Sequence, residues 1–257
     1  MTDTHAPLPF ETTQDHVLGG QLKLLQAARG HRVGHDAILL AACAPGEARR
    51  MVDLGAGVGS AGLAFLTRCP QAGGALVELD PDMVRLAQRN VALNAMAARC
   101  DVVSADVVQM ARPGGPAVPA PSGADLVLMN PPYNMEDAHR TSPHAGRALA
   151  HMAPSTLLTD WVRAASRCLQ PAGMLCLIHR PTAIAMILEA LSGRFGAIEI
   201  LPVHARPDAP AMRLLVRARK ERRTAPIFLP GFVLADENGR QTSGAEAVLR
   251  GGQGLLD

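Results

Sequence analysis

The chain is poor in aromatic residues, and its apolar stretches are short. Aromatic residues make up 3% of its 257 residues, with one tyrosine and one tryptophan among them. The longest apolar runs, such as residues 37–44, are far too short to cross a bilayer. The N-terminus shows no basic segment followed by an apolar one, as a secretory signal would. We therefore expect a cytoplasmic protein that does not associate with membranes.

Paired cysteines and metal-binding motifs are also missing. The five cysteines are scattered and never spaced as C-x-x-C, which predicts reduced, packed side chains rather than disulfides or a zinc site. Nine histidines are present, but His139, His144 and His151 have neither cysteine partners nor helical i, i+4 spacing. We expect no bound metal.

A strong net charge is missing as well, because the formal net charge is +2. This value neither supports nor excludes nucleic acid as a partner. Residues 205–223 carry seven cations against Asp208 and Glu221, a local excess of +5. Such an excess is typical of a phosphate-binding surface, although a solvated strand end has the same composition. The candidate phosphate contacts are Arg206, Arg213, Arg217, Arg219, Lys220, Arg222 and Arg223.

Strands and helices alternate along the chain, which predicts an α/β fold with a mostly parallel, seven-stranded sheet. The expected core strands are 50–54, 75–79, 101–104, 125–129, 174–179, 198–203 and 213–219, the last two as an antiparallel pair. The expected helices are 37–44, 60–68, 81–96, 155–169, 182–195 and one that opens at a Ser243-x-x-Glu246 capping box.

The length fits a single domain over residues 1–257. Residues 1–48 are expected to form an N-terminal extension, with a hairpin that turns at Gly19-Gly20 and one short helix. The main core then covers 49–220, and a tail with a strand and a helix covers 221–257. The segment 111–124 is rich in Pro, Gly and Ala, which predicts a surface loop.

Polar residues follow four successive predicted strands at their carboxyl ends, where open α/β sheets bind ligands. Glycines after the first strand let the backbone approach a ligand and leave a helix N-terminus facing it. Glu78 is placed to accept from both hydroxyls of a ribose, and Asp106 from an adenine amino group. The candidate binding residues are Asp53, Gly55, Gly57, Gly59, Glu78, Asp80 and Asp106.

The tetrapeptide Asn130-Pro131-Pro132-Tyr133 follows the fourth predicted strand. Its prolines remove two backbone donors and favour an extended turn, which leaves the Asn130 amide oxygen and nearby carbonyls as acceptors. The lone pair of a planar amine is delocalised, and two acceptors that bind its hydrogens favour the pyramidal, nucleophilic geometry. Tyr133 offers a flat face for stacking. The tetrapeptide predicts catalysis on a planar amine, although a simple Pro-Pro turn has the same sequence.

Residues 57–62 also match the G-x-G-x-x-G pattern of dinucleotide-binding folds, with an acid about twenty residues further on. Three features favour a methyl donor over a nicotinamide: Asp53 before the glycines, Asp106 after the third strand, and the Asn130 loop, which hydride transfer does not need. Each acid taken alone could instead cap a helix. A nicotinamide-dependent enzyme and a non-catalytic binder therefore stay as alternatives.

The chain carries four motifs in this order: Asp53-x-Gly-x-Gly-x-Gly, Glu78-Leu-Asp80, Asp106 and Asn130-Pro-Pro-Tyr133. Together they resemble the class I S-adenosylmethionine-dependent methyltransferases of the amino-methylating group. The segments 32–41, 177–181 and 232–242 are similar to bacterial enzymes that methylate adenine beside the anticodon of a valine tRNA.

This resemblance implies a Rossmann-like class I methyltransferase fold and S-adenosyl-L-methionine as the cofactor. Asp53 and the glycines would hold its methionine part, Glu78 the ribose and Asp106 the adenine, while Asn130 and Tyr133 would bind the target amine. Asp36 would lie near the methionine end, with helix capping as the alternative. The implied partner is RNA, most specifically tRNA; a guanine amine of ribosomal RNA and a glutamine amide of a translation factor remain alternatives, and the oligomeric state stays open.

Overall fold

The computed structural model describes residues 8–28, 34–116, 123–132 and 154–256. Several predicted features lie outside these ranges: Tyr133, the histidines at 139, 144 and 151, residues 32 and 33 of the segment 32–41, and residues 117–122 of the loop 111–124. Within them, no helix is both long and apolar enough to span a membrane.

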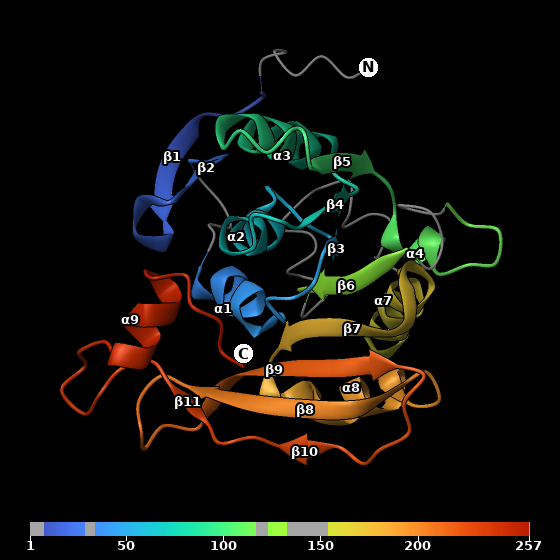
Figure 1. Cartoon of the computed structure of the whole chain (residues 1–257), viewed down its shortest axis with the longest axis vertical. Helices are drawn as coiled ribbons and strands as arrows, with labels where there is room; N and C mark the ends of the chain where they lie inside the picture. Colours follow the sequence, from blue (N-terminus) through green and yellow to red (C-terminus); the bar gives the residue numbers. More distant parts are fainter. Residues whose placement is uncertain (1–7, 29–33, 117–122, 133–153, 257) are drawn as a thin grey trace.

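The described residues form a nine-stranded sheet with the order β5-β4-β3-β6-β7-β9-β8-β10, and β11 also pairs with β8 (Figure 1). All its strand pairs are parallel except those of β9, which runs antiparallel to both β7 and β8. The strands are β3 (Arg50–Leu54), β4 (Gly73–Glu78), β5 (Cys100–Ser104), β6 (Ala124–Met129), β7 (Leu169–His179), β8 (Phe195–His204), β9 (Ala211–Lys220), β10 (Ile227–Phe228) and β11 (Phe232–Val233). The predicted α/β class, the seven core strands and their antiparallel pair are confirmed. The strand predicted in the tail 221–257 corresponds to two short ones, β10 and β11; their separate positions were not predicted, because two residues are too few to show an alternating pattern.

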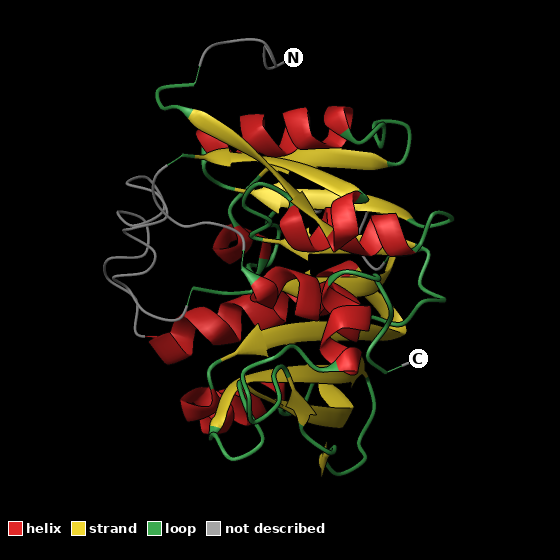
Figure 2. Cartoon of the chain, turned by 90° about the vertical axis from the view of Figure 1, so that its left-hand side faces the viewer, coloured by secondary structure: helices red, strands yellow, loops and turns green. Residues whose placement is uncertain are grey.

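Helices cover both faces of the sheet (Figures 1 and 2). Alternate strand residues point to opposite faces, so β3 contributes Met51 to one apolar cluster and Val52 to the other. The first cluster includes side chains of α1 (His35–Cys43), α2 (Ser60–Arg68) and α3 (Pro81–Leu93). The second includes α7 (Pro154–Cys168), α8 (Ile184–Leu191) and the short α4 (Val107–Met110). All five cysteines are buried and none is in a disulfide, as the sequence predicted.

The predicted hairpin consists of β1 (Thr12–Val17) and β2 (Leu22–Ala27), which pair antiparallel around a turn where Gly19 and Gly20 have positive φ. Asn90 of α3 holds it in place: its side-chain oxygen accepts from the Leu25 N–H at 2.6 Å, and its Nδ2 donates to the Leu25 carbonyl at 3.0 Å. The same Nδ2 donates to the Val58 carbonyl at 2.9 Å. Asn90 thus connects the hairpin to the glycine-rich loop after β3.

Two predicted helix caps are wrong. Helix α1 begins at His35 with Gly34 as its N-cap, and Asp36 lies within its first turn, where its side chain does not cap the helix. Helix α9 (Ser243–Leu249) is capped by Thr242, whose Oγ1 accepts from the Ala245 N–H at 3.1 Å, and not by Ser243. In both cases a neighbouring residue takes the extended conformation that an N-cap needs.

Candidate active site

The predicted binding residues converge at one edge of the sheet, where the parallel strands end; we call it the carboxyl edge. In the register, Leu54 of β3 lies beside Val77 of β4 and Met129 of β6, and Glu78 lies beside Ser104 of β5. Four polar positions that are far apart in the sequence are therefore neighbours. They are Asp53, Glu78, Asp106 and Asn130.

Asp53 is buried, with 2% of its surface exposed, and its Oδ2 accepts from the Gly62 N–H at 2.8 Å. This bond connects the end of β3 to the first turn of α2. Burial raises the pKa of Asp53 to about 7, while the bond from Gly62 acts in the opposite direction. Asp53 therefore fixes the geometry of the glycine-rich loop between these two elements.

This raised pKa predicts how stability depends on pH. The folded state keeps the Asp53 proton up to about pH 7, whereas the unfolded chain releases it near pH 4, so the free energy of unfolding falls as pH rises between these values. Asp53→Asn should remove that part of the slope. Urea unfolding of wild type, Asp53→Asn and the exposed control Asp208→Asn between pH 4.5 and 7.5 measures it; equal slopes in all three would contradict the assignment.

The glycine-rich loop depends on left-handed backbone at three positions, because φ is +67° at Gly55, +57° at Gly57 and +90° at Gly59. A Cβ at Gly55 would also overlap Cη2 of Trp161, which α7 packs against the loop. A Cβ at Gly57 would have no heavy atom within 4 Å. The loop is thus packed against protein at Gly55 and open at Gly57, where a ligand can approach the backbone.

Glu78 connects the end of β4 to this loop. Its Oε2 accepts from the Gly57 N–H at 2.7 Å, and its Oε1 accepts from the N–H groups of Leu79 and Asp80 at 2.8 and 2.9 Å. Burial raises its pKa, while these three bonds favour the charged form. A carboxylate has about four acceptor positions, so Glu78 retains acceptor capacity for a ligand hydroxyl.

Asp80 and Asp106 are helix N-caps. Asp80 Oδ1 accepts from the N–H groups of Asp82 and Met83 at 2.7 and 3.2 Å, at the start of α3. Asp106 Oδ1 accepts from the Val108 N–H at 2.8 Å, at the start of α4. In each of these carboxylates one oxygen, Oδ1, caps a helix, as the capping alternative predicted. The same hydrogen bonds hold both side chains at the carboxyl edge.

Asn130, Pro131 and Pro132 directly follow β6. Asn130 and Pro132 are half-buried and Pro131 is buried, and Tyr133 lies outside the described residues. Met129 pairs with Leu177 of β7, so the next residues of both strands reach the carboxyl edge together. There, His179 is 5% exposed and its Nδ1 accepts from the Arg180 N–H at 2.9 Å. Burial lowers the pKa of His179, and the nearby cations Arg180 and Arg213 act in the same direction.

Sequence reasoning missed two of these residues. Trp161 belongs to the apolar stripe of α7. It is the single tryptophan of the chain, and that was the one signal that could have indicated its place at the site. His179 follows a buried strand, as the other site residues do, and that position could have indicated it.

Asp36 forms an ion pair with Arg213, with 2.7 Å between Oδ2 and Nε. Both side chains are about a quarter exposed, at 23% and 24%. The pair joins the first turn of α1 to the start of β9. Arg213, predicted as a phosphate contact, therefore neutralises an acid that was predicted to lie near the ligand.

The predicted basic segment does not form one surface. Since β9 runs antiparallel, Arg213 lies at the carboxyl edge, next to Leu214, which pairs with His179. Arg219 and Lys220 lie at the opposite edge, where Arg219 pairs with Met174. Arg217, between them, contacts Glu199 at 2.9 Å and donates to the Leu256 carbonyl at 3.0 Å. A ten-residue strand spans about 30 Å, which separates the two groups.

Comparison with known proteins identifies similar sequences and structures. The model of the family described as methyltransferase small domain matches residues 32–205. The chain is 32% identical to a protein of Tolumonas auensis named tRNA1(Val) (adenine(37)-N6)-methyltransferase, over 80% of this chain and 89% of that protein. It is 33% identical to an Aeromonas hydrophila protein of the same name, over 72% and 75%. Among solved structures, a predicted O-methyltransferase from Agrobacterium tumefaciens is 31% identical with a TM-score of 0.69, over 86% of this chain and 98% of that one.

Proposed function

The chain belongs to the methyltransferase small domain family, and on that premise we propose that it methylates N6 of an adenine in the anticodon loop of a tRNA. The names of the Tolumonas and Aeromonas relatives support this target. The single observation that carries the proposal is the position of Asn130-Pro131-Pro132 after β6, next to the end of β3 with Asp53 and on the same edge as Glu78 and Asp106 after the next two strands.

We propose S-adenosyl-L-methionine as the methyl donor, and the site fits it in two respects. Gly57 has open space where a side chain would stand, so the donor's methionine part can lie against the loop backbone. Glu78 is held rigidly by three N–H groups and retains acceptor capacity for a ribose hydroxyl. When bound, the donor supplies an electrophilic sulfonium methyl group. Asp53, Gly55, Gly59, Asp80 and Asp106 would complete the binding site.

The chain's own contribution to the reaction is positioning and hydrogen bonding. The Asn130 amide oxygen and a nearby backbone carbonyl would accept from the two N–H groups of the target amine, and Pro131 and Pro132 keep this turn rigid. Held in this way, the amine nitrogen would take the methyl group that the donor supplies as its bond to sulfur breaks, and would then release a proton to water. Tyr133 would stack on the base. Alignment of the two reactants contributes several kcal/mol in such a reaction.

An oxygen target is the second candidate, since the similar Agrobacterium protein is named a predicted O-methyltransferase. A hydroxyl must lose its proton to a base as it reacts, whereas an amine needs acceptors for hydrogens that it keeps until after transfer. An asparagine side chain is an acceptor and not a base. Asn130 therefore favours nitrogen.

RNA phosphates near the target nucleotide would be bound at the carboxyl edge. Arg206 is exposed in the turn between β8 and β9, and Arg213 is partly exposed beside it. We propose these two as phosphate contacts of the target loop. Both Arg213 and Arg217 form an ion pair, but Arg217 is not proposed because its side chain is only 11% exposed, against 24% for Arg213, and it also donates to the Leu256 carbonyl.

Glu78→Ala is expected to weaken binding of S-adenosylhomocysteine by about 1–3 kcal/mol, because it removes an acceptor for the ribose and leaves the Gly57 N–H without its partner. Calorimetry measures the change, with the exposed loop variant Glu237→Ala as the control. Unchanged affinity in folded Glu78→Ala would contradict the ribose assignment.

The function itself is tested by incubating the protein with donor labelled in the methyl group and with separate pools of tRNA, ribosomal RNA and protein. We expect label in tRNA. Label in ribosomal RNA or protein alone would contradict the proposed substrate while leaving methyl transfer intact, and binding of NAD in place of S-adenosylhomocysteine would contradict the cofactor.

A further inference from the structure

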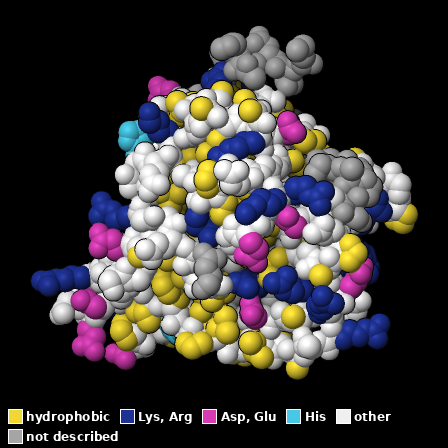
Figure 3. Space-filling view, in the orientation of Figure 1, with side chains coloured by type: hydrophobic (Ala, Val, Ile, Leu, Met, Phe, Trp, Pro, Cys, Tyr) yellow, Lys and Arg dark blue, Asp and Glu magenta, His cyan; other side chains and the backbone are white. Residues whose placement is uncertain are grey.

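Cationic side chains gather at the amino edge of the sheet, opposite the candidate active site. Strand β3 begins there, β9 ends there, and the segments before β8 and after β9 lie beside them. The cations are Arg49, Arg50, Arg194, Arg219, Lys220, Arg222 and Arg223, which we call the amino-edge basic surface. Figure 3 shows one face of the molecule, on which Lys and Arg side chains are interspersed with Asp and Glu side chains.

Hydrogen bonds show that this surface is continuous. Arg50 Nη2 donates to Gln170 Oε1 at 2.9 Å, which bridges the start of β3 to the start of β7. Two side chains of β9 donate to carbonyls of β7 nearby: Lys220 Nζ to Leu169 at 2.7 Å and Arg219 Nη1 to Ala172 at 3.4 Å. The Glu221 N–H donates to the Arg194 carbonyl at 2.8 Å, which brings in the segment before β8.

Most of these bonds hold the cations in place without neutralising them, because the acceptors are carbonyl and amide oxygens. Three carboxylates lie among the seven cations: Glu47, Asp125 and Glu221. Asp125 accepts from the backbone N–H groups of Arg49 and Arg50 at 2.9–3.2 Å, and Glu221 is 60% exposed. Seven cations against three carboxylates leave four positive charges in excess.

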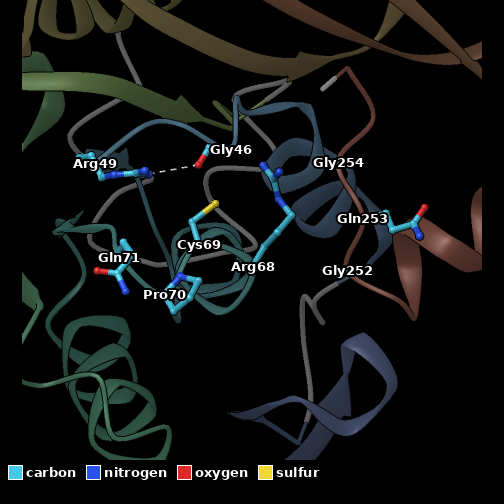
Figure 4. Close-up of a pocket in the computed structure, with 9 residues that line it drawn as sticks. All are labelled: Gly46, Arg49, Arg68, Cys69, Pro70, Gln71, Gly252, Gln253 and Gly254. Atoms are coloured by element: carbon cyan, nitrogen blue, oxygen red, sulfur yellow. Dashed lines mark hydrogen bonds between the residues drawn. The ribbon is translucent and has the colours of Figure 1, made fainter.

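A cavity of about 640 Å³ opens at one end of the surface, between Arg49 and Arg68 (Figure 4). Gln71, Gly252, Gln253 and Gly254 also line it, and none of the nine lining residues that the structure describes is acidic. Arg49 donates to the Gly46 carbonyl at 3.3 Å, and Arg68 donates to the Ala41 and Ala44 carbonyls at the end of α1. Two guanidinium groups with amide and backbone donors fit a phosphate group.

We infer that the amino-edge basic surface binds the phosphate backbone of the RNA substrate at a distance from the target nucleotide. The inference rests on the proposed function. Strands of five or six residues are about 17–20 Å long, so phosphates at Arg50 and a base at Asn130 belong to separate parts of one folded RNA. Contacts from Arg and Lys to phosphates carry no sequence information, so this surface adds affinity rather than base selection.

Two double variants test the surface: Arg49→Gln/Arg50→Gln and Arg222→Gln/Arg223→Gln. The control, Arg163→Gln/Arg250→Gln, removes the same charge from exposed positions elsewhere, with side chains 46% and 68% exposed. Equilibrium binding is measured over a range of salt concentrations with a full-length tRNA and with an anticodon stem-loop alone. Melting curves establish that every variant is folded.

Each double variant should weaken binding of full-length tRNA about tenfold at low salt and lower the salt slope by about 1.4–1.8, since each of the two lost phosphate contacts contributes roughly 0.7–0.9. Binding of the stem-loop should match wild type. The inference would be overturned if the double variants lost equal affinity for both RNAs, or lost no more affinity than the control. It would also be overturned if the wild-type protein bound anionic vesicles in preference to tRNA. A different outcome separates this inference from the proposed function. If the double variants bind tRNA more weakly but the wild-type protein transfers no methyl group to tRNA, the proposed function is overturned and the surface is still an RNA-binding surface.

Discussion

Asn130→Ala is expected to lower the single-turnover rate of methyl transfer by about two to three orders of magnitude, the scale for loss of one preorganised charge-stabilising group. The substitution removes the side-chain oxygen that accepts from the target amine, and it leaves Pro131 and Pro132 to keep the turn extended. Donor binding should change far less, because Asp53 and Glu78 make their contacts to the glycine-rich loop without Asn130.

Asn238→Ala is the matched control, because it removes an exposed asparagine side chain from a loop. It keeps the hydrogen bond that the backbone N–H of residue 238 donates to Asp236 Oδ1. Rates are compared with melting temperatures and with the affinity for S-adenosylhomocysteine. If the tetrapeptide were only a rigid turn, the stability, donor affinity and activity of Asn130→Ala would fall together. Near-native turnover in the folded variant would contradict its catalytic role.

Gly55→Ala is expected to destabilise the protein by about 2–4 kcal/mol. The residue would be held at φ +67°, which is unfavourable for a side chain, and its Cβ would overlap Trp161. Donor affinity should fall as well, since the loop between β3 and α2 must shift. Urea unfolding and calorimetry measure the two effects.

Gly57→Ala separates the two causes. Its φ is similar, at +57°, but a Cβ there would meet no heavy atom within 4 Å. It should therefore cost about 1–2 kcal/mol of stability from backbone strain alone, and it should still impair donor binding because the methyl group occupies open space at the loop. Equal destabilisation by the two substitutions would show that the Trp161 contact has no energetic role.

The sheet was predictable because its strands are buried on both faces and read as short apolar runs. The last two long strands were recognised as an antiparallel pair, and β8 and β9 confirm it. The order of polar residues at the strand ends was predictable for a similar reason: parallel strands that neighbour one another bring their carboxyl ends together.

Contacts between distant segments were not predictable from local patterns. The pairing of Asp36 with Arg213 joins residues 177 positions apart, and nothing near either residue indicates the other. The basic segment looked like one surface because the sequence places its cations close together, whereas an extended strand separates its two ends. Conversely, Arg50 and Lys220 are distant in sequence but lie on the same edge, because β3 begins there and the antiparallel β9 ends there.

The most direct test of the central claim is the identity of the nucleoside that carries the label after methyl transfer to tRNA. We predict N6-methyladenosine, at the nucleotide that follows the anticodon of a valine tRNA, formed about two to three orders of magnitude more slowly by Asn130→Ala. A label found as a 2′-O-methylated nucleoside, or on a guanine amine, would contradict the assignment of Asn130 to an adenine N6 group.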